Sequence, residues 1–265
     1  MLRRLGRIAL AASVLFAGLG FDGNRIGAAS SGQMGGAIYT ELEQMGDAIY
    51  AELEQRKTDI AFAYAGDREE LSAGIAALLK ETLARDDYVA YNVDAYLYTI
   101  RRRGAAADVR VEVAYRETAA ETARVDERLR GVLPAILKDA AGERERVRAI
   151  HDWIVAHVAY DTALRHYTAY DALAAGTAVC QGYALLAYRM LKLAGIETRI
   201  AEGRVDSGSH VWNLVKAEGR WYHMDTTWDD PLPDRPGQAR HAYFLKSDAV
   251  MRKDHTWTKA YPPAG

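Results

Sequence analysis

The chain has 265 residues, of which 49% are hydrophobic and 26% are charged, and its formal net charge at pH 7 is −2. These values are ordinary for a soluble globular protein with a real core, made of one large domain or two small ones. No basic stripe with interleaved aromatic residues is present, and the one basic run, 101–103, lies beside Gly104 as in a solvated loop. Nucleic acid is therefore a poor candidate partner.

The first 29 residues have the layout of a secretory signal peptide. Three arginines within the first seven residues precede an uncharged apolar run over residues 8–21, and small residues follow at 27–29. The apolar run is shorter than the ~20 residues that a membrane-spanning helix needs, so an uncleaved anchor is the minority alternative. We therefore expect a secreted or cell-envelope protein, with no stable membrane insertion after cleavage at the end of the segment 1–29.

A Ser/Gly-rich linker is expected over 30–36, and a duplicated sequence follows it. Residues 37–44 recur almost unchanged at 48–55, with a period of eleven that is close to three helical turns. The pattern predicts one amphipathic helix that packs on its own domain, and a short dimerising coil is the less favoured alternative. The apolar face of this helix would comprise Ile38, Leu42, Met45, Ile49 and Leu53.

The rest of the segment 37–118 reads as a small α/β module. We predict a strand over 60–65, and then a helix that opens with a capping box at Asp67 and Glu70. Two alternating segments, 88–101 and 109–115, are joined through a glycine turn and predict an antiparallel hairpin. No recognisable chemistry lies on this module, and its tyrosines are interpreted as sheet packing.

The segment 119–265 begins with two predicted helices, 119–138 and 143–158. Pro134 is expected to kink or break the first one. His151 and His157 on the second are six residues apart, so they do not share a face as a metal-binding pair would. They are interpreted as exposed or capping histidines, and the loop that follows them contains a short helical turn at 171–174.

Cys180 is the only cysteine, and it stands where a loop becomes a helix. An apolar helical pattern runs from it to Leu193, and Gly195 is suited to the helix C-terminus. Unpaired N–H groups and the dipole at a helix start favour a thiolate and stabilise an oxyanion, while Gly182 permits close approach. The alternatives are a buried, inert cysteine or one paired between chains.

Three strands are predicted after the cysteine helix, over 197–205, 210–216 and 221–228. A two-residue turn at 218–219 would place Trp212 opposite Asp225, so that His210 and Asp225 are diagonal neighbours about 7 Å apart. An Asp–His hydrogen bond is within reach at that distance. It would fix the tautomer of the imidazole and orient the ring toward the thiol.

Several motifs together resemble one family. They are Val179 to Ala184, His210 to Asn213 and Trp221 to Pro231, with a tail that contains Tyr243 to Leu245 and Asp254 to Trp257. From about residue 148 onward the chain resembles the transglutaminase-like superfamily of papain-fold cysteine enzymes. The resemblance implies an α+β catalytic domain over 119–265, in which the cysteine-bearing helix packs on an antiparallel sheet. It also implies Cys180 as nucleophile, His210 as general base and acid, and Asp225 as the group that orients the imidazole.

Related enzymes complete the oxyanion hole with a polar side chain upstream of the cysteine, and no Gln, Asn or Trp lies between residues 159 and 179. The candidates here are Tyr170 and Gln181, beside the backbone N–H of the cysteine itself, and Tyr167 is a further possibility. Trp212 is interpreted as a core aromatic or as part of a substrate groove. A metal site made of His223, Asp225, His241 and His255 is not favoured, and we expect no metal and no cofactor.

The function that the motifs favour is an exported, cysteine-dependent acyl-transfer enzyme that acts on protein or peptide amides through a thioester. Water would resolve the acyl-enzyme in a peptidase or amidase, and a lysine amine would do so in a cross-linking transglutaminase. The alternative is a weakly active or inactive module that binds peptide or cell-wall polymer. The expected partner is a protein or peptide substrate, with a substrate associated with the cell wall as one alternative, and the sequence does not predict the oligomeric state.

Overall fold

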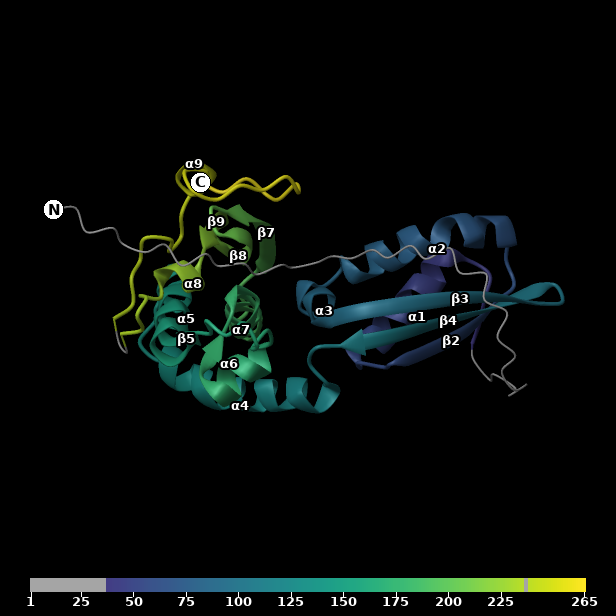
Figure 1. Cartoon of the computed structure of the whole chain (residues 1–265), viewed down its shortest axis with the longest axis horizontal. Coiled ribbons are helices and arrows are strands. Elements are labelled where there is room, and N and C mark those ends of the chain that lie inside the picture. The colour runs from purple at the N-terminus through teal and green to yellow at the C-terminus, as the bar shows by residue number, and fades with distance from the viewer. Residues whose placement is uncertain (1–36, 236–237) are drawn as a thin grey trace. The chain divides into compact units, whose positions relative to one another are not determined.

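The computed structural model describes residues 37–235 and 238–265. The predicted signal peptide and linker lie outside these residues. The described chain divides into two compact units, with Arg116 as the last residue of the first and Glu117 as the first residue of the second. Each unit has its own sheet and its own helices (Figure 1), and each is described by itself. Among the described residues, no helix combines the length and apolar character that crossing a bilayer requires.

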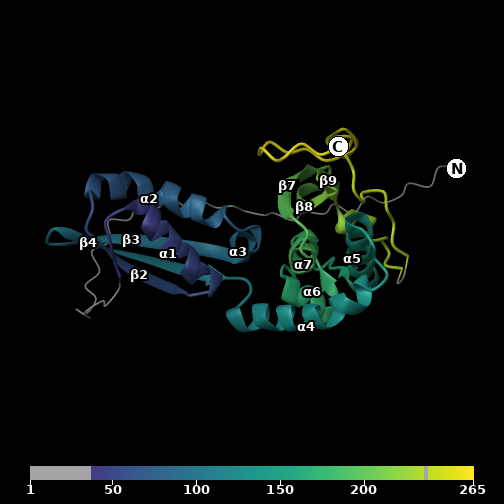
Figure 2. The same ribbon diagram turned by 180° about the vertical axis from the view of Figure 1, so that it is seen from behind.

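The N-terminal unit is a four-stranded sheet with helices on one face. The strand order is β1-β2-β4-β3, and the hairpin of β3 and β4 is antiparallel, as predicted. The helices α1 and α2 lie on the same side of the sheet, which Figure 2 shows from behind the view of Figure 1. The strands are β1 (Ile38–Tyr39), β2 (Asp59–Tyr64), β3 (Val93–Arg103) and β4 (Ala106–Tyr115), and the helices are α1 (Leu42–Glu54), α2 (Arg68–Leu83) and α3 (Asp87–Asn92).

Two predictions for this unit need correction. The duplicated segment is not one helix, because the first copy contains the strand β1, and Ile38 is 67% exposed rather than on the buried face. The segment 88–92 is helical rather than extended, because the Asp86 side chain accepts a hydrogen bond from the backbone N–H of Val89 and caps α3. The buried face of α1 does contain Met45, Ile49 and Leu53 as predicted.

The C-terminal unit is built around the helix that Cys180 begins. Eleven of the fourteen residues of α7 (Cys180–Leu193) are buried, as in a core helix. Three helices surround it, and Pro134 lies inside the first of them, which continues without a break. These are α4 (Ala119–Leu137), α5 (Glu143–His157) and α6 (Ala169–Ala175), and a short parallel pair joins β5 (Ala159–Tyr160) to β6 (Thr177–Ala178).

An antiparallel sheet packs on α7, in the order β7-β8-β9. The predicted two-residue turn is present, because Ala217 pairs with Arg220. The last strand ends at Met224 rather than at Trp228, and Asp225 instead caps the short helix α8, so that part of the strand prediction was wrong. The elements are β7 (Thr198–Val205), β8 (Gly208–Ala217), β9 (Arg220–Met224), α8 (Thr226–Asp229) and α9 (Asp248–Met251).

The C-terminal tail closes over this sheet. Arg204 on β7 exchanges backbone hydrogen bonds with Thr256, which places the tail directly on the strand. Gly203 permits this approach, because a Cβ at that position would collide with the carbonyl oxygen of Thr256 and lie 2.9 Å from the Trp212 ring. The glycine therefore determines how closely the tail, including His255, packs against β7, on which Gly203 pairs with His210 of the neighbouring strand.

Candidate active site

Cys180 occupies the first position of α7 and is 1% exposed. The turn before it is tightly packed, since a Cβ on Gly182 would lie 2.7 Å from the Cβ of Ala178 and 3.0 Å from the carbonyl oxygen of Thr168. The close approach expected at this glycine is therefore present. The thiol lies at a helix N-terminus, where backbone N–H groups lack intrahelical acceptors and the dipole favours negative charge.

His210 lies near the start of β8 and is bonded to Asp225. The distance from its Nε2 to the Asp225 Oδ2 is 2.6 Å, and the two residues are 3% and 0% exposed. The strand brings the histidine to α7 through Asn213, whose amide Nδ2 donates to the Ala184 carbonyl at 3.0 Å. Since Nε2 is bonded to the carboxylate, Nδ1 is the ring nitrogen left for the hydrogen bond between His210 and the Cys180 thiol.

Asp225 is held from two directions. As the N-cap of α8, its Oδ1 accepts hydrogen bonds from the backbone N–H groups of Thr227 and Trp228, at 3.0 and 3.1 Å. Its Oδ2 accepts from both His210 and His255, the second at 3.1 Å. The carboxylate therefore has four hydrogen-bond partners, which fix its position even though it lies beyond the end of β9.

The electrostatics favour an ion pair in this cluster. Burial by itself lowers the pKa of His210, but the charge and hydrogen bond of Asp225, together with those of Cys180, raise it to about 10. Burial raises the pKa of Asp225, and the two imidazoles outweigh that effect and hold it well below its usual range. A protonated imidazole between a carboxylate and a thiol is the arrangement that stabilises a thiolate.

His255 extends the cluster into the tail. Its Nδ1 bonds to the Asp254 Oδ1 at 2.7 Å, and Asp254 also accepts the Tyr243 hydroxyl at 2.6 Å. The His255 ring packs against Trp228 at 4.5 Å between centroids and against Trp212 at 5.0 Å. Sequence reasoning expected Cys180, His210 and Asp225 to lie together, as they do, but it missed the contact of His255 with this group, although the Asp-His pair in the tail belonged to the family resemblance.

The residues predicted for the oxyanion hole or substrate groove lie in three different settings. Gln181 is 4% exposed in the first turn of α7. The Tyr170 hydroxyl lies 3.3 Å from the Arg124 Nη1 of α4 and accepts from it. Trp212 is 1% exposed, and its Nε1–H donates to His223 at 2.8 Å, which makes it a core residue beside the imidazole of His210 rather than the wall of an open groove.

Tyr160 is a further candidate for the site, and the sequence analysis did not name it. It lies on β5, paired with Ala178 two positions before the cysteine, and the electrostatic influence of Cys180 contributes to raising the pKa of its hydroxyl. Burial is the larger cause of that rise. Within the described part of the chain, this buried hydroxyl has no hydrogen-bond partner. The sequence search considered Tyr167 and Tyr170 in the loop before the cysteine and not this tyrosine at the end of the preceding helix.

A second cluster of histidines and carboxylates lies at the other end of α8. His151 is fully buried, and its two ring nitrogens bond to the Asp152 Oδ1 at 2.8 Å and to the Asp229 Oδ2 at 3.0 Å. Burial lowers its pKa, and the two carboxylates outweigh that effect and raise it. The prediction of an exposed or capping histidine was wrong for His151, because Asp229 lies 78 residues away in the sequence.

His223 is bonded elsewhere. Its Nε2 lies 2.7 Å from the Asp248 Oδ1, and its Nδ1 accepts from Trp212. Two groups among the described residues could hold a metal ion, namely His210 with Asp225 and His255, and His151 with Asp152 and His241. His223 belongs to neither of them.

Comparison with known proteins agrees with this geometry. Residues 130–226 match the model of the Transglutaminase-like superfamily, and this range contains Cys180, His210 and Asp225. The C-terminal unit of this chain therefore belongs to the transglutaminase-like superfamily, and the predicted α+β fold of that family is confirmed. The superfamily includes cysteine peptidases and transglutaminases.

Particular relatives can also be named. The chain is 33% identical over 156 residues to kyphoscoliosis peptidase of Homo sapiens, covering 48% of this chain, and 30% identical over 175 residues to that of Mus musculus, covering 56%. It spans about a quarter of the length of these curated relatives, 24% and 26%. The crystal structure of a TGase is similar at 12% identity and a TM-score of 0.38, over 74% of this chain and 59% of that one.

Proposed function

We propose that the chain is a cysteine-dependent acyl-transfer enzyme that acts on amides of proteins or peptides. The observation that carries the proposal is the buried bond between His210 and Asp225, with the imidazole hydrogen-bonded to Cys180 at the start of α7. A module that only binds peptide or cell-wall polymer does not require these three groups to converge. The expectation of export through residues 1–29 is part of the proposal.

The first chemical step follows from the ion pair. The Cys180 sulfur attacks the amide carbon and forms the S–C bond, and the carbonyl oxygen takes up the electron pair as an oxyanion. His210 then gives its proton to the amine nitrogen as the C–N bond breaks. Asp225 keeps its charge throughout and holds the ring, so that its role is orientation and stabilisation of the imidazolium.

The second step resolves the thioester. His210, neutral after the first step, takes a proton from an incoming water or amine, whose oxygen or nitrogen attacks the acyl carbon. The C–S bond breaks and the thiolate returns to its place beside the imidazolium. Water gives the acid, as in a peptidase or amidase, and an amine gives a new amide, as in a transglutaminase.

The oxyanion in both steps needs hydrogen-bond donors. The backbone N–H at the start of α7 is one candidate, and the Tyr160 hydroxyl is the second that we propose. This hydroxyl is buried, is under the electrostatic influence of Cys180, and has no bond among the described residues that a substrate would need to break. A donor of this kind contributes on the order of 10²–10³ in rate. Tyr170, whose hydroxyl is held by Arg124, is the weaker candidate.

Hydrolysis is the outcome that we favour. The curated relatives at 33% and 30% identity are named as peptidases, and this is the observation that supports the choice. Cys180, His210 and Asp225 are all at most 3% exposed, so a substrate amide reaches the thiol only when neighbouring side chains move. The proposed substrate is therefore a segment of protein or peptide that can enter between them.

The test is incubation of the purified protein with unfolded proteins and glutamine peptides, with and without an amine donor. Intact mass measurement should detect an acyl adduct on the parent chain and none on Cys180→Ala. New amino termini or released ammonia would indicate hydrolysis, and incorporated amine would indicate transfer. If the parent and Cys180→Ala behave alike in all of these assays, the chain is not an acyl-transfer enzyme and the binding module becomes the better account.

A further inference from the structure

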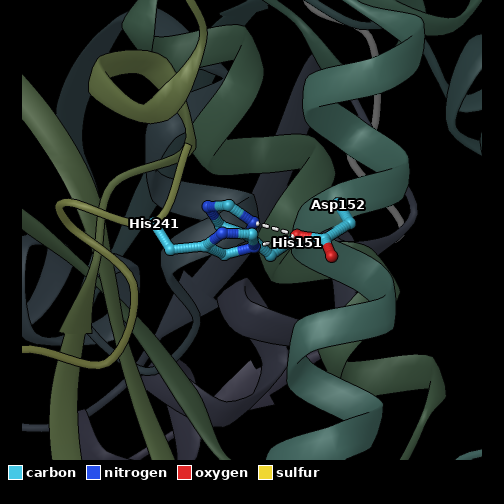
Figure 3. A group of neighbouring side chains, drawn as sticks. All are labelled: His151, Asp152 and His241. Carbon is cyan, nitrogen blue, oxygen red and sulfur yellow. Dashed lines mark hydrogen bonds and ion pairs between the residues drawn. The ribbon is translucent and has the colours of Figure 1, made fainter. Parts of the chain in front are cut away.

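The second histidine–carboxylate cluster combines ligand atoms from two distant segments. His151 and Asp152 lie on α5, and His241 lies in the segment between α8 and α9. Figure 3 shows the two imidazoles converging beside the carboxylate of Asp152. The His151 Nδ1 and the His241 Nε2 lie 2.8 and 2.6 Å from the same oxygen, Asp152 Oδ1, and the three ligand atoms all lie within 4.8 Å of one another.

The spacing of these atoms suits a small divalent ion. Metal–ligand bonds of about 2.0–2.1 Å in a tetrahedral site place neighbouring ligand atoms roughly 3.3 Å apart. The two N–O distances here would need to open by about 0.5 and 0.7 Å to reach that spacing, which a rotation of the partly exposed Asp152 and His241 side chains can supply. The ion would replace the two hydrogen bonds that the imidazoles now make to the carboxylate oxygen.

A second layer of contacts already orients the ligands. The His151 Nε2–H donates to Asp229, which is 0% exposed, so the tautomer that leaves Nδ1 as a metal ligand is the one that this bond favours. Asp229 also fixes the segment around His241. Its carbonyl accepts from the Arg240 backbone N–H at 3.1 Å, and its carboxylate accepts from that of Tyr243 at 3.0 and 3.1 Å.

The cluster is open on one side and covered on another. The side chains of Asp152 and His241 are 38% and 33% exposed, so an ion and a coordinating water have access. Phe244 packs edge-on against both rings, at 5.2 Å from His151 and 5.7 Å from His241 between centroids. An apolar wall beside two imidazoles and a carboxylate is typical of sites for first-row transition ions rather than for Ca²⁺ or Mg²⁺, which prefer oxygen ligands.

We infer that His151, Asp152 and His241 form a binding site for a divalent transition ion such as Zn²⁺, with water as a further ligand. The bound ion joins α5 to the segment after α8. That segment also contacts the triad acid, because the Asp225 backbone N–H donates to the Tyr243 carbonyl at 3.2 Å. The site is therefore placed to stiffen the support of Asp225 without touching the reacting atoms.

The test uses the full chain without an affinity tag and with Cys180→Ala, so that the thiol does not bind the metal. Zn²⁺ is titrated against a chromophoric chelator, and Co²⁺ is used in parallel because its visible spectrum reports nitrogen and oxygen ligands. We expect one ion per chain. We expect at least tenfold weaker binding for His241→Ala. We expect a 10- to 100-fold loss for Asp229→Asn, whose carboxylate bonds to the ligand His151 and lies outside the proposed ligand set.

Two control variants separate this site from other histidines. His157→Ala removes an exposed histidine on the same helix, which stacks on Trp153 and bonds to its carbonyl. His255→Gln alters the other cluster that could hold a metal ion. Both should bind Zn²⁺ as the parent does. Absence of binding at 100-fold excess of Zn²⁺ over protein, unchanged binding in His241→Ala, or an equal loss in His255→Gln would each overturn the inference.

Discussion

The two ends of the four-residue helix α8 carry clusters of similar composition with different properties. Asp225 begins the helix and bonds to two imidazoles that are at most 3% exposed, beside the only thiol of the chain. Asp229 ends the helix and bonds to His151. The side chains beside that imidazole, Asp152 and His241, are 38% and 33% exposed. The presence of histidine and aspartate therefore does not by itself define what a cluster can do. The burial of the side chains and the presence of a neighbouring thiol distinguish the two clusters. The first cluster suits proton transfer, and the second suits an ion that enters from solvent.

The largest expected effect comes from Asp225→Asn. An amide can donate to the His210 Nε2, which would hold the wrong tautomer, so the rate of acyl transfer should fall by about 10⁴. The matched control is Asp248→Asn, because that carboxylate also bonds to a buried imidazole, His223, at 2.7 Å. The measurement is the initial rate with an activated ester. An equal loss of rate in both variants would show that Asp225 has no role in acyl transfer beyond that of any carboxylate bonded to a buried histidine.

The next effect concerns stability and pH. The lowered pKa of Asp225 contributes stability above about pH 4, and the contribution is lost as the pH falls. The raised pKa of His210 contributes fully below about pH 6.5, and that contribution is lost as the pH rises toward 10. In the Cys180→Ala background, which keeps Asp225 and removes the part of the rise that the thiol causes, the cost of His210→Gln in urea unfolding should be largest between about pH 4 and 6.5. It should shrink by about 1–3 kcal/mol as the pH rises through the raised pKa that remains.

The control for this pH effect is His223→Gln. Burial, the largest cause, lowers the pKa of His223, so its neutral form is favoured in the folded chain and its contribution should grow as the pH rises toward about 6.5 and stay constant above that value. Above about pH 6.5 the cost of His210→Gln should therefore fall while the cost of His223→Gln stays level. Parallel pH profiles would contradict the assigned electrostatics.

Tyr160→Phe should lower the rate of acyl transfer by about 100-fold, because one oxyanion donor is lost. Alkylation of Cys180 by iodoacetamide forms no oxyanion, so its rate should change by less than about twofold. Tyr64→Phe is the matched control, since its hydroxyl is also buried without a partner among the described residues but lies in the N-terminal unit. If alkylation slows as much as acyl transfer, Tyr160 acts on the thiol or on the fold rather than on the oxyanion.

The smallest effect is expected for His255→Gln. Loss of one charge-assisted hydrogen bond to Asp225 should lower the rate by about tenfold. That bond also helps to hold the pKa of Asp225 low, so the acid limb of the pH–rate profile should move to higher pH. A loss of rate with no movement of the acid limb would show that His255 acts only through packing.

The pairing of His210 with Asp225 could be predicted from the register of two neighbouring strands, and the family resemblance added Cys180 to them. Cys180 stands at the start of an apolar helix, and the turn at 218–219 fixes the register of β8 and β9. The strand was wrongly extended to Trp228, because Trp and Thr have high strand propensity. The Asp225 side chain instead caps a helix by accepting the N–H groups two and three residues later, a local signal that competes with strand propensity.

The second cluster and Tyr160 could not be predicted in the same way. His151 meets Asp229 and His241 only after α5 packs beside the segment that follows α8, so no spacing along one helix reveals the cluster. Tyr160 is identified by the lack of a hydrogen-bond partner for its buried hydroxyl, which only the folded chain shows. Helix periodicity likewise did not reveal that the first copy of the duplication enters a sheet as β1.

The most direct test of the central claim is the rate of Cys180 alkylation by iodoacetamide between pH 6 and 9. Because the chain has one cysteine, every adduct reports this thiol, and Cys180→Ala should show none. We expect the parent rate to change by less than about threefold over this range, and the His210→Ala rate to rise about tenfold per pH unit until about pH 8.5, as for an ordinary thiol. Slow labelling of the parent with that same pH dependence, unchanged in His210→Ala, would contradict the triad.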